Sequence, residues 1–309
     1  MSTESVRSNA DLSAIVDLSA IARPGGAFSM LAIDQRESLR TLLVAAKHGA
    51  TDADMTRFKV AVARTLSPAA SGILVDRDYG LEAMTAAGVI APACGLIVAV
   101  DRLIQQSGGP LEDSQLDRPA MASDLSRHGA RALKFLVIWR PGDPVAPRRT
   151  MVADFVEGCR RAGLLSVLEG LVQTPGSSDP EVFDAAIVAA AAEFAAFEPD
   201  LYKTHVPTLG LGTPAKIEEL SAVVSRTIRR PWVVLSAGVP VERFATAVEA
   251  ACRGGASGFL AGRGVWGPSI RTEDPERDLA GAGLERLTEL VAIAERHARP
   301  WREAAARPR

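Results

Sequence analysis

The stretch Arg161-Ala-Gly-Leu-Leu-Ser-Val-Leu-Glu169 contains the pattern that decides the fold. A helical segment ends at Gly163, because glycine suits the left-handed residue that follows a helix. A short, near-continuous apolar run comes next, as in strands that are buried on both faces of a parallel sheet, and it ends in a carboxylate. Glycine also separates a helical segment from an apolar run at 127–130 and at 253–256. The stretch therefore predicts a repeated strand–helix unit.

Apolar runs of this kind occur about eight times along the chain. The predicted strands are Phe28–Asp34, Ser71–Asp76, Gly95–Asp101, Ala132–Ile138, Leu164–Glu169, Asp200–Thr204, Trp232–Ser236 and Ser257–Gly262. Helical patterns lie between them, at Arg36–Ala46, Ala53–Thr65, Arg118–His128, Arg148–Arg161, Pro180–Phe197, Pro214–Thr227 and Val241–Arg253. Eight units are the number that a (β/α)8 barrel needs.

We therefore expect an α/β fold with a single (β/α)8 TIM barrel domain over residues 1–309. A doubly wound open sheet is the main alternative. It is disfavoured because no GxGxxG motif follows the first strand and no GxxxxGK[ST] motif occurs. A short N-terminal extension, over about residues 1–17, and an Arg-rich tail at 296–309, which we expect to be frayed, lie outside the barrel. Segments 141–147 and 173–179 are predicted to be loops.

Composition excludes several classes of function. The 309 residues carry 35 Lys and Arg against 37 Asp and Glu, so no broad basic field is available for nucleic acid or for a membrane surface. Residues 1–18 lack the apolar core of a signal peptide, and no run of ~18 apolar residues occurs, which favours a cytoplasmic protein. Three widely spaced cysteines and four scattered histidines predict neither a disulfide nor a metal site, and we expect no cofactor.

Polar side chains gather where the predicted strands end. In a barrel the carboxyl ends of the strands face the active site, so side chains from distant segments should meet there. The candidates are Asp34 and Gln35 after the first strand, Lys134 within the fourth, Glu169 at the end of the fifth, Lys203 in the sixth, Ser236 to Gly238 after the seventh, and Gly262 and Arg263 after the eighth.

Lys203 is informative because the chain has only five lysines. Its side chain could extend from the strand end into solvent, or it could be a nucleophile that forms a Schiff base. An amine attacks a carbonyl only when it is neutral, and burial and a nearby cation both disfavour the ammonium form. Lys134 can supply that cation. An ion pair between Lys134 and Glu169 on the next strand is compatible with this role.

The remaining candidates each have two interpretations. Glu169 is either a proton carrier or a structural partner of Lys134 or an arginine. Asp34 is either a site residue or the N-cap of the following helix. The small residues around Ser236, Gly238 and Gly262 expose backbone N–H groups, and with Arg263 they favour phosphate binding, although Arg263 could instead be held in an ion pair. His205 shares the strand face of Lys203 and remains a possible site residue.

Six stretches together resemble the class I tagatose 1,6-bisphosphate aldolases, and they resemble the related sulfofructosephosphate aldolases still more closely. The stretches are 25–37, 129–139, 163–169, 200–203, 231–239 and 256–263. The resemblance implies a (β/α)8 barrel, usually a homo-oligomer, and a metal-free lysine Schiff-base aldolase with Lys203 as its nucleophile. It assigns acid–base and orienting roles to Glu169, Lys134, Asp34 and Gln35, and anion binding to Ser236, Arg263 and nearby amides.

The substrate implied by this resemblance is 6-deoxy-6-sulfofructose 1-phosphate, which is cleaved to 3-sulfolactaldehyde and dihydroxyacetone phosphate. Tagatose or fructose 1,6-bisphosphate is the alternative. The family has an acidic residue two positions after the lysine, where this chain has His205, and this departure bears on the substrate more than on the reaction. A non-catalytic barrel that senses a sugar phosphate is the alternative from another class.

Overall fold

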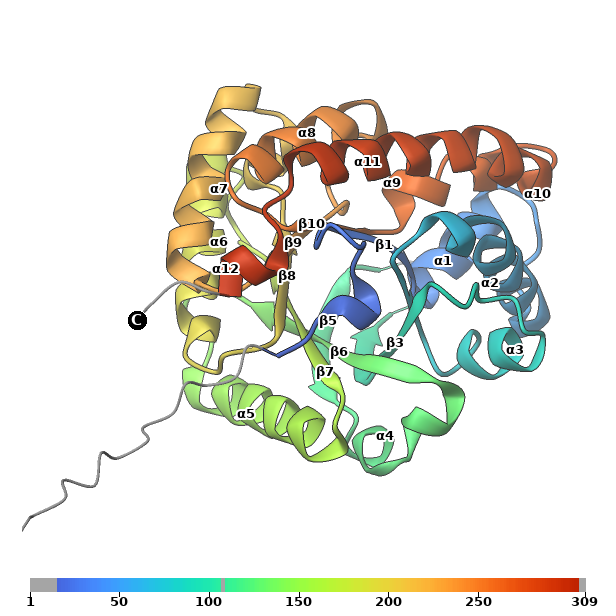
Figure 1. The fold of residues 1–309 in the computed structure, drawn as a ribbon, viewed down its shortest axis with the longest axis horizontal. Helices are drawn as coiled ribbons and strands as arrows, with labels where there is room; N and C mark the ends of the chain where they lie inside the picture. Colours follow the sequence, from blue (N-terminus) through green and yellow to red (C-terminus); the bar gives the residue numbers. More distant parts are fainter. Residues whose placement is uncertain (1–15, 107–108, 306–309) are drawn as a thin grey trace, which may run out of the picture.

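A computed structural model describes residues 16–106 and 109–305. Eight parallel strands close into a barrel in the order β1-β10-β9-β8-β7-β6-β3-β2 (Figure 1). They are β1 (Phe28–Ile33), β2 (Gly72–Val75), β3 (Gly95–Ala99), β6 (Ala130–Trp139), β7 (Leu165–Val172), β8 (Leu201–His205), β9 (Trp232–Leu235) and β10 (Gly258–Ala261). Every predicted strand is present and the sheet is closed. The barrel prediction is therefore confirmed, and the open-sheet alternative is wrong.

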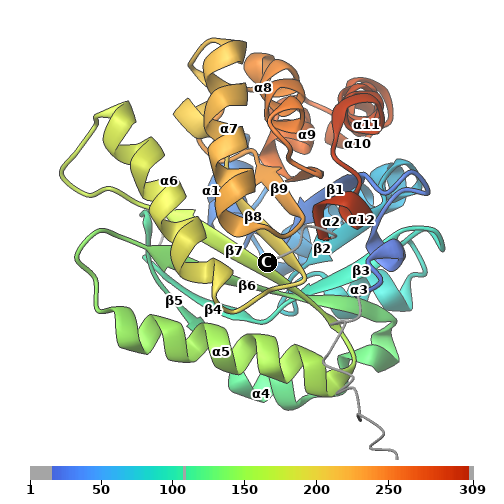
Figure 2. The ribbon, with the colours of Figure 1, turned by 60° about the vertical axis from the view of Figure 1, so that its left-hand side comes forward.

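Helices surround the barrel in both views (Figures 1 and 2). They are α1 (Glu37–Ala45), α2 (Asp52–Leu66), α3 (Leu81–Ala86), α4 (Arg118–Ala122), α5 (Val145–Ala162), α6 (Pro180–Ala195), α7 (Pro214–Ile228), α8 (Val241–Arg253), α9 (Arg263–Trp266), α10 (Pro275–Asp278), α11 (Leu284–His297) and α12 (Trp301–Ala305). Short turns η1 (Ser19–Ile21), η2 (Ser67–Ala69), η3 (Leu125–His128), η4 (Pro207–Gly210), η5 (Ser269–Arg271) and the π-helical turn η6 (Leu279–Gly283) connect them.

Local signals explain where several of these helices begin and end. Thr51 and Asp54 form a reciprocal capping box at the start of α2. Gly163 takes the expected left-handed conformation after α5. One prediction was too long: the helix expected over 118–128 is divided into α4 and η3, because Ser123 adopts an extended backbone and its hydroxyl donates to the Ala120 carbonyl. The loop predicted over 141–147 is shorter than expected, since α5 begins at Val145.

A two-stranded antiparallel hairpin interrupts the regular pattern between β3 and β6. It consists of β4 (Asp101–Gln105) and β5 (Leu111–Leu116), and it was not predicted. The predicted third strand, Gly95–Asp101, ends at Ala99 in the structure, and Asp101 begins the hairpin instead. Ser114 Oγ donates to the Leu136 carbonyl on β6, which fixes the hairpin against the barrel (Figure 2).

The apolar core has two parts, one inside the barrel and one between the barrel and its helices. At the end of the barrel where the strands begin, Trp301 of α12 packs against the interior cluster and is 4% exposed. The tail is therefore ordered as far as Ala305, and the prediction that it is frayed is wrong up to that residue, because Trp301 gains burial by covering the barrel end. Residues 306–309, and residues 1–15 of the predicted extension, lie outside the described part of the chain.

Three further features bear on the sequence predictions. Cys94, Cys159 and Cys252 are buried and free of disulfides. Among the helices of residues 16–106 and 109–305, none is long and apolar enough to cross a membrane. Within the same ranges, no group of three His, Cys, Asp or Glu side chains is arranged to hold a metal ion.

Candidate active site

The alternation of side chains along the strands builds a polar layer on top of the barrel interior. Ala132, Val167 and Leu201 belong to the interior apolar cluster, on β6, β7 and β8 respectively. Side chains two positions further along a strand point to the same face, so the next inward residues are Lys134, Glu169 and Lys203. Glu169 and Lys203 are direct neighbours in the β7–β8 register. The sequence thus changes from apolar to charged at one level of the barrel.

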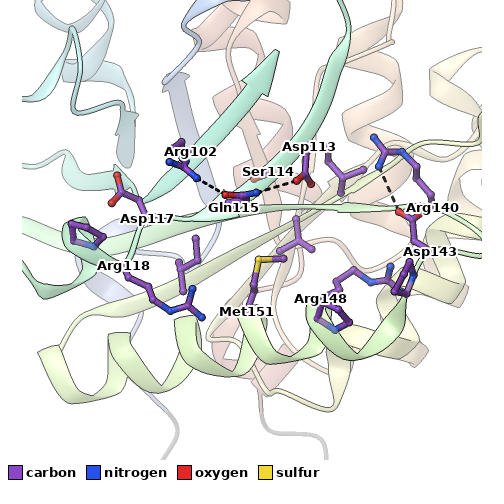
Figure 3. A pocket seen from close by; sticks show the side chains of 16 residues that line it. Arg102, Asp113, Ser114, Gln115, Asp117, Arg118, Arg140, Asp143, Arg148 and Met151 are labelled. Atoms are coloured by element: carbon purple, nitrogen blue, oxygen red, sulfur yellow. Dashed lines mark hydrogen bonds and ion pairs between the residues drawn. The ribbon is translucent and has the colours of Figure 1, made fainter. Parts of the chain in front are cut away.

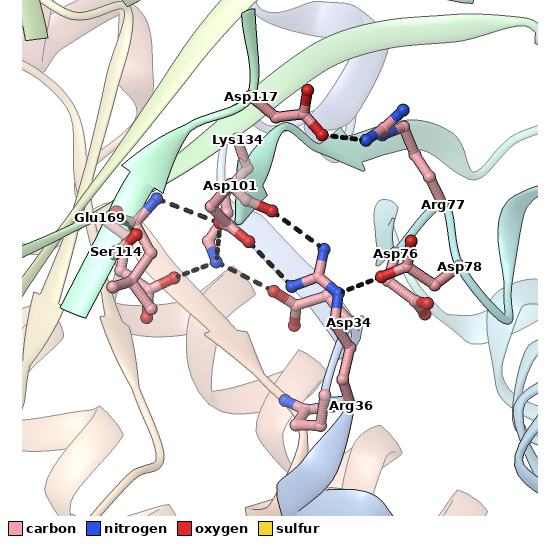
Figure 4. A network of polar contacts seen from close by, with 12 residues as sticks. Asp34, Arg36, Asp76, Arg77, Asp78, Asp101, Ser114, Asp117, Lys134 and Glu169 are labelled. Atoms are coloured by element: carbon pink, nitrogen blue, oxygen red, sulfur yellow. Dashed lines mark hydrogen bonds and ion pairs between the residues drawn. The ribbon is translucent and has the colours of Figure 1, made fainter. Parts of the chain in front are cut away.

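Lys134 lies at the centre of this layer (Figure 4). Its Nζ is 2.9 Å from Asp34 Oδ2, 2.9 Å from Asp101 Oδ2 and 3.0 Å from Glu169 Oε2. Burial alone would lower the pKa of Lys134, but the three carboxylates outweigh it and hold that pKa well above its usual value. Lys134 is therefore a fixed positive charge whose three ammonium donors all face carboxylates.

Lys203 shares a carboxylate with Lys134. Its side chain is 5% exposed, and its Nζ donates to Glu169 Oε2 at 2.9 Å, the same oxygen that lies 3.0 Å from Lys134 Nζ. The predicted Lys134–Glu169 ion pair is thus present. Glu169 contacts Lys203 as well as Lys134. One oxygen atom that contacts both lysines can exchange a proton with Lys203 while Lys134 keeps its charge.

Asp101 and Arg36 belong to the same network, and sequence reasoning missed both. Arg36 donates to Asp101 Oδ1 at 3.0 Å and to Asp78 Oδ2 at 2.8 Å. Burial would raise the pKa of Asp101, but Lys134 and Arg36 lower it below its usual value, so Asp101 remains a carboxylate. A signal was available, because Asp101 ends a predicted strand just as Asp34 does.

Asp34 is not the N-cap of the helix that follows it. The N-cap residue of α1 is Arg36, and this helix start has no side-chain cap among the described residues. Burial would raise the pKa of Asp34, but Lys134 and Lys203 hold it well below its usual range. The carboxylate of Asp34 is therefore a permanent anion that holds Lys134 in place.

A buried lysine on α2 fixes the backbone on both sides of Asp34. Lys59 Nζ donates to the carbonyls of Ile33 and Gln35 at 2.6 and 2.7 Å, and to Asp76 Oδ1 at 2.5 Å. The side chains of Lys59 and Asp76 are both 0% exposed. Sequence analysis missed Lys59 because it falls inside an ordinary helical pattern.

Replacing Lys59 should therefore destabilise the fold strongly. Lys59→Met leaves a buried carboxylate and two carbonyl oxygens without their donor, and breaking one side of a buried ion pair costs about 3–5 kcal/mol. We expect the free energy of unfolding, measured in urea, to fall by that amount. Lys216→Met is the control, since the Lys216–Glu219 pair is half exposed and contributes about 1 kcal/mol at most. A loss no larger than that of the control would contradict the buried-pair role.

The polar layer opens into a cavity of about 440 Å³. Eight of the nine predicted site residues line it: Asp34, Gln35, Lys134, Glu169, Lys203, Ser236, Gly262 and Arg263. Gly238 does not line it; its φ of +81° serves the turn after β9, where a Cβ would meet Leu209 at 2.9 Å. Gly262 must stay small, because a Cβ there would lie 2.4 Å from the Ala32 carbonyl oxygen.

The anion-binding candidates have donors that are free for a ligand. Ser236 Oγ accepts from the Gly264 amide at 3.2 Å, which leaves the hydroxyl proton available. Arg263 is exposed to the cavity, and it has no ion pair with another described residue. The ion-pair alternative for Arg263 is therefore not observed in the described part of the chain.

His205 is close to Lys203 in sequence but takes no part in the cavity lining. Its ring is buried and packs edge-on against Phe183, with centroids 5.1 Å apart. Burial lowers the pKa of His205 to about 4, so the ring is neutral at neutral pH. This histidine is a packing residue, and it does not add a charge beside the lysine.

A larger cavity, of about 650 Å³, lies outside the barrel between the hairpin and α5 (Figure 3). Three of its four arginines have acidic partners: Arg118 contacts Asp154, Arg140 contacts Asp143 and Arg148 contacts Glu193. The fourth, Arg102, donates to Gln115. None of the nine predicted site residues lines it. The reactive groups therefore belong to the smaller cavity.

Comparisons with known proteins relate the chain to a family of aldolases. A family model described as DeoC/LacD family aldolase matches residues 28–267. The chain is 27% identical to a tagatose 1,6-diphosphate aldolase of Listeria monocytogenes, over 89% of this chain and 90% of that protein. It is 28% identical to tagatose 1,6-diphosphate aldolase 2 of Streptococcus mutans, over 93% and 95%.

Two solved structures have the same fold. The fructose-bisphosphate aldolase of Plasmodium falciparum, determined with TRAP and a small-molecule inhibitor, superposes with a TM-score of 0.70 at 14% identity and covers 94% of each chain. The fructose-bisphosphate aldolase of Slackia heliotrinireducens superposes with a TM-score of 0.60 at 19% identity, over 86% of each chain. Identities this low support the barrel fold alone.

Proposed function

The chain belongs to the DeoC/LacD family of aldolases, and from this premise we propose that it cleaves a ketose 1-phosphate through a Schiff base on Lys203. The products are dihydroxyacetone phosphate and an aldehyde. The observation that carries the proposal is the shared oxygen Glu169 Oε2, which lies 2.9 Å from Lys203 Nζ and 3.0 Å from Lys134 Nζ.

The first step needs a neutral amine. Lys134 is held as an ammonium by its three carboxylates, and Lys203 donates to the Glu169 oxygen that also contacts Lys134. Glu169 accepts the proton that Lys203 loses. The amine then attacks the C2 carbonyl of the open-chain sugar. Glu169 returns its proton to the C2 hydroxyl, which leaves as water, and the nitrogen of the resulting iminium can accept an electron pair.

The second step breaks the C3–C4 bond. Glu169, again as a carboxylate, takes the proton of the C4 hydroxyl, and the C3–C4 electron pair moves into the iminium while C4 becomes the aldehyde carbon. The enamine that remains is protonated at C3 by the proton that Glu169 took from the C4 hydroxyl. Water then hydrolyses the new iminium, which releases dihydroxyacetone phosphate and regenerates Lys203.

The order of side chains around the barrel matches the order of atoms along a ketose 1-phosphate. Arg263 follows β10 and Ser236 follows β9, Lys203 lies on β8 and Glu169 on β7, and these strands are consecutive neighbours. A phosphate at C1 held near Arg263 and Ser236 would bring C2 to Lys203 and the C4 hydroxyl to Glu169. Asp34 and Gln35, after β1, complete the ring beside β10.

Arg263 should bind the C1 phosphate. An arginine offers two parallel donors to a tetrahedral anion, and losing a charge-assisted contact costs about ten- to 150-fold in affinity. Arg263→Ala should therefore raise KM by that factor, and the Lys203 adduct should still form at saturating substrate. Arg263→Lys should recover only part of the loss, because a point charge cannot reproduce the two-pronged contact.

The control for this prediction is Arg271→Ala, which removes an exposed arginine that does not line the cavity. Its KM should equal that of the unmodified protein. If Arg263→Ala instead lowered the melting temperature and left KM unchanged, Arg263 would be a structural residue and would be removed from the proposed site.

The group at C6 is a separate question from the reaction. The relatives are named for tagatose 1,6-diphosphate, and no comparison supports 6-deoxy-6-sulfofructose 1-phosphate, the substrate that the sequence resemblance favoured. The proposed function is tested by incubating the protein with C4-epimeric ketose 1-phosphates and measuring dihydroxyacetone phosphate. A barrel that only senses sugar phosphates would bind them without product and without a borohydride-stable adduct.

A further inference from the structure

We propose that Trp266, a buried tryptophan outside the cavity, is a positioning residue for phosphate binding, because its indole N–H holds the turn that carries Arg263 against β1. The inference rests on the proposed function and deepens it, since it concerns how Arg263 reaches the C1 phosphate. Trp266 does not line the cavity, so its effect on a substrate must act through residues that do.

The side chain of Arg263 depends on the backbone that carries it. It is exposed to the cavity, and it has no ion pair with another described residue that would fix it from the side. Arg263 is also the first residue of α9, a helical turn of only four residues. The place of this turn therefore decides where the guanidinium donors lie.

The turn begins where β1 has lost one of its neighbours. β1 pairs with β10 only as far as Leu31 and Ala261, whereas it pairs with β2 as far as Ile33 and Val75. After Ala261 the chain turns at Gly262 into α9. The pairing of the two strands therefore does not extend to α9, and another contact must set the distance between the turn and β1.

The indole of Trp266 makes that contact. Its Nε1 donates to the Ala32 carbonyl at 2.9 Å, and the whole residue is 0% exposed. Ala32 follows the last β1 residue that pairs with β10, and it lines the cavity two positions before Asp34. Phe58 of α2 packs edge-on against the indole, with ring centroids 5.6 Å apart, which fixes the orientation of the donor.

The turn is fitted closely on both of its sides. A Cβ at Gly262 would lie 2.4 Å from the Ala32 carbonyl oxygen and 3.1 Å from Trp266 Nε1. On the other side, the Gly264 amide donates to Ser236 Oγ at 3.2 Å. Trp266 thus ties the turn to β1, and Gly264 ties it to the residue that follows β9. A shift of this turn would move Arg263 relative to Ser236 and to the cavity.

Trp266→Phe tests the role of the indole donor. Arg286 of α11 still donates to the Val265 carbonyl at 2.8 Å in this variant, so we expect the turn to shift rather than to unfold. Loss of a neutral hydrogen bond corresponds to about three- to tenfold in an equilibrium constant, and KM should rise by that factor. Because Lys203 and Glu169 lie on β8 and β7, kcat should stay within about twofold.

The assay measures dihydroxyacetone phosphate from tagatose 1,6-bisphosphate and from its C4 epimer, fructose 1,6-bisphosphate, and uses the one that is cleaved faster. A double-mutant cycle then asks whether Trp266 acts through Arg263. In the double variant Trp266→Phe, Arg263→Ala, KM should equal that of Arg263→Ala alone, because no guanidinium remains to be displaced. Two independent defects would instead multiply.

Trp232→Phe is the matched control. Trp232 is also buried, at 1% exposed, and its Nε1 donates to Ser225 Oγ at 2.9 Å. It is the first residue of β9, at the opposite end of the strand from Ser236, and it does not line the cavity. Both substitutions remove one buried hydrogen bond and should lower the melting temperature, but Trp232→Phe should leave KM unchanged.

The outcomes separate this inference from the proposed function. If Trp266→Phe has the KM of Trp232→Phe, or if its effect multiplies with that of Arg263→Ala, the inference is overturned and the aldolase function stands. A fall in kcat at unchanged KM would show that the indole acts on Asp34 instead, and it would overturn the inference as well. If the unmodified protein releases no dihydroxyacetone phosphate from any ketose 1-phosphate, the proposed function fails and takes the inference with it.

Discussion

Lys203→Met should lose cleavage activity by a factor of at least ~10⁴ while the fold persists, because no other group of the cavity can form the iminium. Lys134 cannot replace it, since its raised pKa keeps it an ammonium. The substitution removes one partner of Glu169 and leaves the other, Lys134, at 3.0 Å. No buried carboxylate is then left unpaired, which is why we expect the variant to fold.

Borohydride reduction gives this prediction a direct readout. Incubation of the unmodified protein with substrate and borohydride, followed by peptide mass spectrometry, should locate the adduct on Lys203. Lys216→Met serves as the matched control, because it removes an exposed lysine and should retain full activity. An adduct on Lys134, or turnover in Lys203→Met above a thousandth of the control, would exclude Lys203 as the nucleophile.

The eight barrel strands could be predicted because each buries both faces and so appears as a short apolar run. The hairpin could not be predicted in this way. In β5, Leu111 and Leu116 are the only apolar residues, and the strand is held by backbone pairing and by contacts such as Ser114 to the Leu136 carbonyl. Hydrophobicity marks strands that are buried, and this strand is anchored instead by hydrogen bonds.

Charged residues of the site could be predicted where they interrupt an apolar strand, but not where they lie on a helix. Lys134, Glu169 and Lys203 stand out because each is a charge within or at the end of an apolar run. Lys59 is equally buried, but it approaches the site from a helix, and a helical pattern with period 3.6 does not show which charged residue reaches inward. Asp101, like Asp34, is a carboxylate at the end of a predicted strand, but only the structure shows that it lies beside Lys134.

Glu169→Gln should separate the formation of the imine from the breaking of the C3–C4 bond. The amide keeps the size of the side chain and removes its ability to carry a proton, so kcat should fall on the order of 10²–10⁴. Lys203 keeps its amine in this variant and can lose its proton to water, so we expect imine formation to be slower but to persist. The borohydride adduct on Lys203 should still be found, while product formation nearly stops.

A structural role for Glu169 would give a different result, because losing the ion pair alone would lower stability without separating the two steps. The control is Glu219→Gln, an exposed carboxylate paired with Lys216, which should leave both the adduct and kcat unchanged. Glu169→Asp keeps a titrating group but moves it away from the shared contact with Lys134 and Lys203, and it should recover part of kcat. If Glu169→Gln retained kcat within threefold, another group would have to accept the proton of the C4 hydroxyl. Asp34, the other carboxylate that lines the cavity, would then be the first to test, although its lowered pKa makes it a weaker base than the reaction needs.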